Sequence, residues 1–230
     1  MTERPALEVF ENPQGAADAA CAAIVERLRA ALIDRGAANL CVTGGSTPGP
    51  VYDRLSQVDL DWSHVSITLS DERWVDTASA DSNARLVRER LLVGPAAAAR
   101  FVCLKGDETD PVHGAWAADL KVAPLQPFDA VLLGMGDDGH ICSLFPGNPV
   151  LEQGLDPAAA RLVLHTPAGR PAPAQDRVTL TLPALIHAGL ILILTSGQPK
   201  RVILERDGDE PVHHLIRAVN RGDIRLLWSA

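Results

Sequence analysis

Apolar positions along the chain follow two alternating patterns, which predict helices and strands in turn. Residues 15–36 carry alanine, isoleucine and leucine at helical spacing, and Gly36 ends this segment. Shorter, nearly continuous apolar runs at 39–45, 128–136 and 190–197 have the length and composition of buried strands. Continuous apolar strands between helices are typical of a parallel sheet that is covered on both faces.

The remaining segments extend this α/β pattern over the whole chain. We expect further helices at 47–56 (with Thr47 as its cap), 82–92, 110–121, 183–189, 198–206 and 211–219. We expect further strands at 64–70, 101–104, 160–166, 177–182 and 224–229, the last of which could lie at an edge. The sequence therefore predicts one α/β domain over residues 1–230, built on a Rossmann-like, mostly parallel sheet with helices on both faces.

Composition and charge narrow the classes of function. Hydrophobic residues make up 47% of the 230 residues, and the formal net charge is −8, so the overall field repels nucleic acid and anionic membranes. The N-terminal residues have no apolar run typical of a signal peptide, and "AGLILILT" is far too short to span a bilayer. The four cysteines form no C-x-x-C pair, which favours reduced thiols. We expect a cytoplasmic protein without nucleic-acid or membrane partners.

The stretch from Val131 to Gly147 contains the spacing G-x-G-x-x-G, which also occurs in dinucleotide-binding turns. Such a turn needs a helix directly after it to hold the pyrophosphate, whereas here Pro146 follows within a few residues. Asp137 and Asp138 would also repel phosphates. We therefore expect no NAD, and interpret the glycines as a sharp turn that presents His140 at the end of a strand.

His140 and Asp138 are the candidate catalytic residues. Histidine can take up and return a proton near neutral pH, and a neighbouring carboxylate fixes its tautomer and stabilises its protonated form. The alternative is a structural histidine at the end of a loop, bonded to a backbone carbonyl. The glycines and acids around His140 favour the catalytic interpretation over this alternative.

A second strand-to-helix turn, "VTGGSTPGP", has the features of an anion site. Gly44 and Gly45 expose backbone N–H groups, Ser46 and Thr47 add hydroxyls, and a helix begins next. The turn lacks the G-K-[ST] ending that is typical of nucleotide triphosphate sites. The alternative is an ordinary helix cap.

Three basic residues are candidate anion ligands. Lys200 lies in the first turn of an expected helix, where a cation opposes the helix dipole and so favours an anionic partner. Arg73 follows the strand at 64–70, and Arg177 begins the strand at 177–182. Arg73 could instead form a solvated salt bridge within "SDER", which contributes about 0–1 kcal/mol. With Gly44, Gly45, Ser46 and Thr47, these three residues make up the candidate substrate- and phosphate-binding set.

The other histidines give no sign of a metal site. His213 and His214 lie on an expected surface helix, and no two histidines have ligand spacing with a third ligand nearby. We expect neither a required metal nor another cofactor.

Taken together and in order, these motifs resemble those of the 6-phosphogluconolactonases. The matching pieces are "TGGSTP", "SDERWV" with "DSN" shortly after, "GMGDDGH…SLFPG", "RVTLTLPAL" and "SGQPK". They extend over most of the chain, and the combination is specific although each piece is weak. The resemblance implies the fold shared with glucosamine-6-phosphate deaminases, ribose-5-phosphate isomerases and coenzyme A transferases. It also implies hydrolysis of 6-phospho-D-glucono-1,5-lactone to 6-phospho-D-gluconate, in the oxidative pentose phosphate pathway.

The same resemblance gives each candidate residue a role. It implies that His140 is the general base for water, that Asp138 orients it, and that the substrate is a phosphorylated sugar lactone. It also implies that the 6-phosphate is held by Gly45, Ser46, Thr47 and Lys200, with Arg177 as a second candidate cation, and that Arg73 lies near either the sugar or the phosphate. The chain departs from the family pattern at Gly49, where a basic residue is common, and at Ile141-Cys142, where Thr-Ala is frequent. Neither departure touches the implied chemistry.

Two other functions remain as alternatives. A sugar-phosphate isomerase or deaminase of the related family has a glutamate five residues after the histidine, where this chain has Phe145. A non-catalytic sugar-phosphate sensor in a transcription regulator would need a DNA-binding segment, for which the chain has no spare residues or basic patch. The sequence is compatible with a monomer or with a small homo-oligomer.

Overall fold

A parallel sheet forms the centre of the structure, a computed structural model that describes residues 4–169, 174–219 and 223–230. Within these residues the sheet has seven strands: β1 (Leu7–Phe10), β2 (Ala38–Val42), β3 (Val65–Leu69), β5 (Arg100–Val102), β6 (Ala130–Leu133), β9 (Leu190–Ser196) and β10 (Asp223–Ser229). Their order is β1-β10-β9-β6-β2-β3-β5, and every neighbouring pair is parallel. The predicted parallel sheet is thus confirmed.

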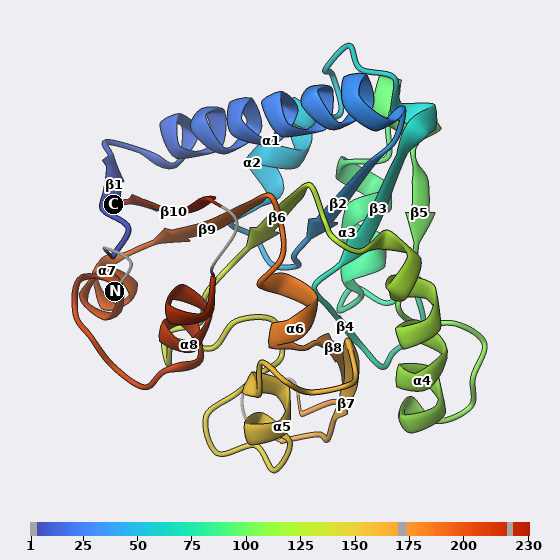
Figure 1. The fold of residues 1–230 in the computed structure, drawn as a ribbon, viewed down its shortest axis with the longest axis vertical. Helices are drawn as coiled ribbons and strands as arrows, with labels where there is room; N and C mark the ends of the chain where they lie inside the picture. The colour runs from blue at the N-terminus through green and yellow to red at the C-terminus, as the bar shows by residue number, and fades with distance from the viewer. Residues whose placement is uncertain (1–3, 170–173, 220–222) are drawn as a thin grey trace.

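Helices cover both faces of this sheet (Figure 1). Their bounds are α1 (Pro13–Arg35), α2 (Gly49–Leu55), α3 (Asn83–Arg90), α4 (Pro111–Val122), α5 (Leu151–Leu155), α6 (Leu182–Leu185), α7 (Gln198–Glu205) and α8 (Pro211–Ala218). The long helix α1 runs along one side of the sheet, and α6 and α8 lie on the other. The Asn12 side chain caps the start of α1, and Gly36 ends it with a left-handed φ of 69°.

A second sheet stands beside the first. Its strands are β4 (Asp71–Arg73), β8 (Arg177–Leu180) and β7 (Val163–Thr166), paired antiparallel in the order β4-β8-β7. Two strands that the apolar pattern predicts therefore belong to this small sheet rather than to the central one. The strand β10 is not at an edge, because β1 pairs with it on its outer side. Strand β1 was not predicted, because its four residues are too few to give a recognisable pattern of apolar positions.

The chain reverses its direction of travel across the sheet between β2 and β6. From β2 the next strands, β3 and β5, lie on one side, whereas from β6 the next strands, β9 and β10, lie on the other. Such a reversal opens a crevice at the carboxyl ends of the two neighbouring strands, where ligands bind in open α/β sheets. The turns after β2 and β6 are "TGGSTP" and "GMGDDGH", so the topology brings both sequence motifs to one place.

Candidate active site

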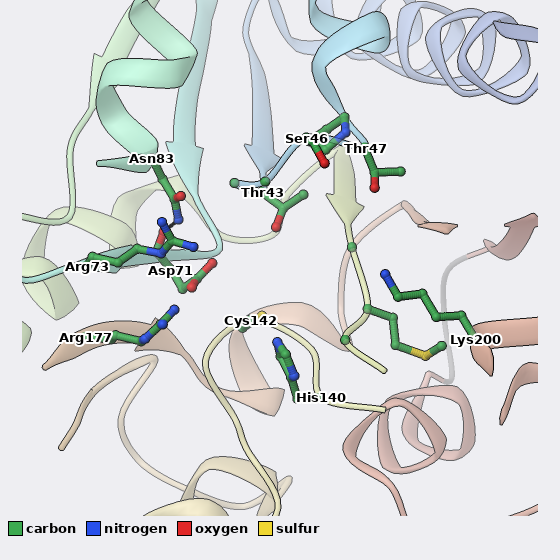
Figure 2. Close-up of a pocket in the computed structure, with 16 residues that line it drawn as sticks. Thr43, Ser46, Thr47, Asp71, Arg73, Asn83, His140, Cys142, Arg177 and Lys200 are labelled. Atoms are coloured by element: carbon green, nitrogen blue, oxygen red, sulfur yellow. Dashed lines mark hydrogen bonds between the residues drawn. The ribbon is translucent and has the colours of Figure 1, made fainter. Parts of the chain in front are cut away.

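A pocket of about 230 Å³ lies at this crevice (Figure 2). Most of its walls come from the segments that follow β2, β3 and β6, together with β8 and the start of α7. The lining includes eight of the nine predicted site residues: Gly44, Gly45, Ser46, Thr47, Arg73, His140, Arg177 and Lys200. The ninth, Asp138, contacts His140 from beside the pocket.

The turn after β2 depends on two glycines. Gly45 has a left-handed φ of 90°, which favours glycine. Gly44 lies against the Asn83 amide, since a Cβ at this position would be 1.9 Å from Asn83 Oδ1. The helix begins at Gly49 rather than after a Thr47 cap, because the Gly49 N–H donates to the Ser46 carbonyl (3.2 Å) in a tight turn. The predicted Thr47 cap is wrong, and Thr47 lines the pocket instead.

Gly49, where the sequence lacks the basic residue common in the resembled family, leaves room for another cation. A Cβ on Gly49 would lie 1.8 Å from Arg90 Nη1, so the guanidinium of Arg90 occupies the space above this residue. Arg90 also pairs with Asp53, to which its Nε donates at 2.9 Å. A basic side chain at position 49 and Arg90 in this position are therefore mutually exclusive.

The loop after β6 is shaped around His140. Gly139 has a φ of 77°, and Gly136 lies so close to the imidazole that a Cβ there would be 2.1 Å from His140 Cε1 and Nδ1. The Gly136 N–H donates to the His140 carbonyl at 2.9 Å, which closes the loop. Gly134 has neither a left-handed φ nor a close neighbour. Two of the three glycines thus serve to hold the imidazole.

His140 and Asp138 form a close pair. His140 Nδ1 lies 2.5 Å from Asp138 Oδ1, and the same oxygen accepts the His140 backbone N–H at 3.1 Å. The imidazole is mostly buried, with 22% of its side chain exposed, whereas Asp138 is 46% exposed. Nε2 has no hydrogen bond to any residue that the structure describes, and the ring points into the pocket (Figure 2). This geometry leaves Nε2 available to accept a proton from a bound molecule.

Arg73 and Arg177 are placed directly opposite each other in the pairing of β4 with β8. Like charges at such positions repel each other. Burial lowers the pKa of Arg177, and Arg73 lowers it further, while Asp71 acts in the opposite direction. Arg73 donates to the Asp81 carbonyl (2.6 Å), but its Nε is buried without a hydrogen-bond partner among the described residues. An anion in the pocket would relieve this repulsion.

The acids of "SDER" have different surroundings. Glu72 is 1% exposed, and its carboxylate accepts hydrogen bonds from Arg73 N, Ser82 Oγ, Asn83 N and Ala84 N at 2.7–3.0 Å. Burial raises the pKa of Glu72, and these four donors act against that rise. Since all of its partners belong to β4 and the start of α3, Glu72 is a structural residue that fixes one to the other.

Asp71 instead lines the pocket, and its two oxygens accept hydrogen bonds from Ser70 Oγ (3.0 Å) and Ser143 Oγ (2.6 Å). Three other pocket residues, Asn83, Met135 and Cys142, belong to the quoted motifs but are not among the predicted site residues. Asn83 could have been found as part of "DSN", since its side chain donates to the Asp71 carbonyl (2.8 Å). Met135 and Cys142 lie within the loop around His140, and neither has a side chain that the predicted chemistry calls for.

Lys200 enters the pocket from the side opposite the two arginines (Figure 2). It lies in the first turn of α7, as predicted, and its Nζ is 3.7 Å from a carboxylate oxygen of Asp137. Asp137 is 82% exposed, so this ion pair is weak and easily exchanged for a bound anion. The pocket therefore has one cation on one side, two on the other, and His140 between them.

The structure adds three findings on the remaining histidines and cysteines. All four cysteines are free thiols; Cys21, Cys41 and Cys142 are buried, and Cys103 is half-buried. Among the described residues, no group of three or more His, Cys, Asp or Glu side chains could hold a metal ion. His213, predicted on a surface helix, is buried, with Nδ1 2.9 Å from Glu210 and Nε2 donating to the Ile203 carbonyl (3.0 Å).

A sequence model of the glucosamine-6-phosphate isomerases/6-phosphogluconolactonase family matches residues 11–228. The chain belongs to this family. It is 43% identical to a 6-phosphogluconolactonase of Caulobacter vibrioides, with 97% of each chain covered, and 39% identical to one of Rhizobium meliloti, with 97% and 98% covered. The family that the sequence motifs resemble is thereby confirmed.

Solved structures of family members have the same fold as this chain. A crystal structure of a 6-phosphogluconolactonase from Shewanella baltica matches with a TM-score of 0.88 and 34% identity over the full length of both chains. A monomeric glucosamine-6-phosphate deaminase matches with a TM-score of 0.76 at 18% identity, which shows the shared fold alone. Among the described residues, none of the helices has the length and apolar character that crossing a bilayer requires.

Proposed function

We propose that this family member hydrolyses 6-phospho-D-glucono-1,5-lactone to 6-phospho-D-gluconate. The observation that carries the proposal is His140, whose Nδ1 is bonded to Asp138 and whose ring enters a pocket with cations on two sides. The substrate has a phosphate at one end and a lactone carbonyl at the other, so it needs two anion-stabilising regions with a base between them. The names of the relatives agree with this reaction.

In the proposed mechanism, His140 Nε2 takes a proton from a water molecule that attacks the lactone carbonyl carbon. Asp138 holds the imidazole in the tautomer with the proton on Nδ1 and stabilises the imidazolium that forms. The tetrahedral intermediate then collapses, and the bond between the carbonyl carbon and the ring oxygen breaks. His140 returns its proton to that oxygen, which becomes the 5-hydroxyl of the open-chain product.

Arg73 and Arg177 would stabilise the charge at the carbonyl end. Attack by water moves negative charge onto the carbonyl oxygen, and hydrolysis leaves a carboxylate on the product. Cations aimed at a developing oxyanion in a pocket sheltered from water are among the largest contributions to catalysis. The opposed placement of the two arginines supports this assignment, as does the buried Nε of Arg73, which has no hydrogen-bond partner in the part of the chain that the structure describes.

The Gly44–Thr47 turn and Lys200 would bind the 6-phosphate. The turn supplies backbone N–H groups and two hydroxyls, and Lys200, in the first turn of α7 after β9, supplies a positive charge. In this arrangement the phosphate lies away from Arg73 and Arg177, and the sugar ring extends past His140 toward them. The proposal thus gives each cation in the pocket a separate part of the substrate.

Replacing Lys200 tests the phosphate assignment. Lys200→Ala is expected to raise KM for the phosphorylated lactone about 10- to 100-fold, because a hydrogen bond to a charged group contributes about 1.5–3 kcal/mol. KM for unphosphorylated gluconolactone should change little. The measurement is steady-state kinetics of the same protein preparation with both lactones.

Arg201→Ala is the matched control, since Arg201 is the next residue of α7 but pairs with Glu205 and stacks on Trp228. Its KM for either lactone should stay near that of the wild type. If Lys200→Ala raises KM for both lactones equally, Lys200 does not bind the phosphate.

Chelation tests whether the reaction needs a metal ion. We expect extended dialysis against a chelator to leave kcat unchanged, because the proposed mechanism uses His140 and the two arginines where a metal enzyme would use its ion. The measurement is kcat before and after dialysis, with and without added zinc. A loss of activity that zinc restores would contradict this mechanism.

The same preparation distinguishes the proposed reaction from that of the deaminases. Incubation with glucosamine 6-phosphate should release no ammonia, because position 145 holds an apolar phenylalanine rather than an acid. Incubation with freshly made phosphogluconolactone should produce 6-phosphogluconate. The reverse result would assign the chain to the other activity of its family.

A further inference from the structure

Phe145 lies in contact with two groups of the proposed mechanism at once. Its ring centroid is 4.4 Å from that of His140, in an edge-to-face contact with an interplanar angle of 63°. The guanidinium carbon of Arg177 lies over the same ring, 5.1 Å from its centroid. Phe145 itself is only 4% exposed, so the surrounding protein packs around its ring and holds it in place. One buried aromatic ring therefore joins the imidazole to one of the arginines.

The segment that carries Phe145 is firmly anchored. Two residues earlier, Ser143 donates through its backbone N–H to Thr179 Oγ1 (3.0 Å) and through its hydroxyl to Asp71 (2.6 Å). The Phe145 carbonyl accepts the Asn148 N–H at 3.1 Å. Because these contacts tie the segment to β8 and to the pocket wall, the ring has little freedom to move with the loop.

The imidazole of His140 is held at two other points, and neither fixes its tilt alone. Asp138 holds Nδ1 through one hydrogen bond, which restrains the ring at a single atom. Gly136 allows the close approach of Cε1 and Nδ1 but offers no side chain to grip them. Edge-to-face aromatic contacts have a preferred geometry, so Phe145 supplies the missing restraint.

The buried guanidinium of Arg177 gains from the same ring. Arg177 is 6% exposed, and burial disfavours its charge. A cation over an aromatic face is attracted by the ring, most strongly where water is excluded. Leucine at position 145 would fill much of the space but would offer neither this attraction nor a flat face.

We propose that Phe145 is a positioning residue that sets the orientation of both the His140 imidazole and the Arg177 guanidinium. The inference rests on the proposed function, in which His140 is the base and Arg177 faces the lactone carbonyl. The Phe145 ring contacts both side chains. It would therefore fix the position of the water that His140 activates relative to the carbonyl oxygen that Arg177 stabilises. Small misplacements of reacting groups have large effects on rate, which makes such a restraint catalytically important.

The test compares variants with and without a ring. Phe145→Leu should lower kcat about 10- to 100-fold with KM within about threefold of the wild type, and Phe145→Tyr should keep kcat within about threefold. Phe145→Met is a second ringless variant in case the leucine variant folds poorly. Phe101→Leu is the matched control, because Arg88 stacks on Phe101 (5.3 Å) outside the pocket. The control should keep the kcat of the wild type.

A measurement without substrate separates this inference from the proposed function. In NMR spectra of the free protein, the ring N–H proton of His140 that is bonded to Asp138 should be visible in the wild type and in Phe145→Tyr. It should broaden or vanish in Phe145→Leu as the imidazole loses its fixed orientation. An unchanged His140 signal and unchanged kcat in the folded leucine variant would overturn the positioning role, as would equal losses of kcat in the leucine and tyrosine variants. Failure of the wild type to hydrolyse the lactone would instead refute the proposed function.

Discussion

His140→Asn is expected to lower kcat about 10²–10⁴-fold, equivalent to about 3–5.5 kcal/mol of transition-state stabilisation. Asparagine fits the space of the imidazole and can still bond to Asp138, but it cannot accept and return a proton. The fold and KM for the phosphorylated lactone should therefore stay close to those of the wild type. Steady-state kinetics and thermal unfolding of the two proteins, side by side, give the answer.

The chain contains a matched control for this variant. His165 Nε2 lies 2.7 Å from Asp176 Oδ1, so it forms a second His–Asp pair, but it does not line the active-site pocket. His165→Asn should keep the kcat of the wild type. If folded His140→Asn keeps a kcat near that of the wild type, another residue is the general base, and Asp71 is the next residue to test.

The second large effect concerns stability. Glu72→Ala is expected to lower the free energy of unfolding by roughly 3–4 kcal/mol, because it leaves buried donors without their acceptor. The donors are Arg73 N, Ser82 Oγ, Asn83 N and Ala84 N, which Glu72 holds at 2.7–3.0 Å. A loss of this size is a large share of the total stability of about 5–15 kcal/mol that is typical of proteins. Urea unfolding of the wild type and the variant measures it.

Glu205→Ala is the control for this prediction, because among the described residues the Glu205 side chain pairs with Arg201 alone, in an exposed i,i+4 pair. Its removal should change the free energy of unfolding by about 0.5 kcal/mol or less. When kcat is calculated for the folded fraction of the protein, Glu72→Ala should lower it far less than His140→Asn does. A stable Glu72→Ala with a collapsed kcat would show that Glu72 takes part in the chemistry rather than in the fold.

The candidate site was largely predictable because its residues follow strands. "TGGSTP" and "GMGDDGH" each come directly after a continuous apolar run, and the ends of parallel strands meet at one sheet edge. The pair of Asp138 with His140 is local in sequence, so the glycines around it were enough to suggest it. Lys200 was found for the same reason, from its place in the first turn of a helix after β9.

Other features depend on pairings between distant segments, which spacing in the sequence does not encode. Arg73 meets Arg177 because of the register of β4 with β8, and Arg90 covers Gly49 from a different helix. The role of Phe145 likewise appears only when β8 brings Arg177 over its ring. His213 is buried because α8 packs against α7, and the pattern of apolar residues around His213 does not predict this burial.

The proposed activity is tested most directly by following freshly made 6-phospho-D-glucono-1,5-lactone by 31P NMR near neutral pH, with wild-type protein, with His140→Asn and with buffer alone. Catalytic amounts of the wild type should convert the lactone signal into that of 6-phosphogluconate much faster than buffer does. His140→Asn should lie close to the buffer rate. Decay at the buffer rate with folded wild-type protein would contradict the proposed activity, and equal acceleration by both proteins would contradict the proposed role of His140.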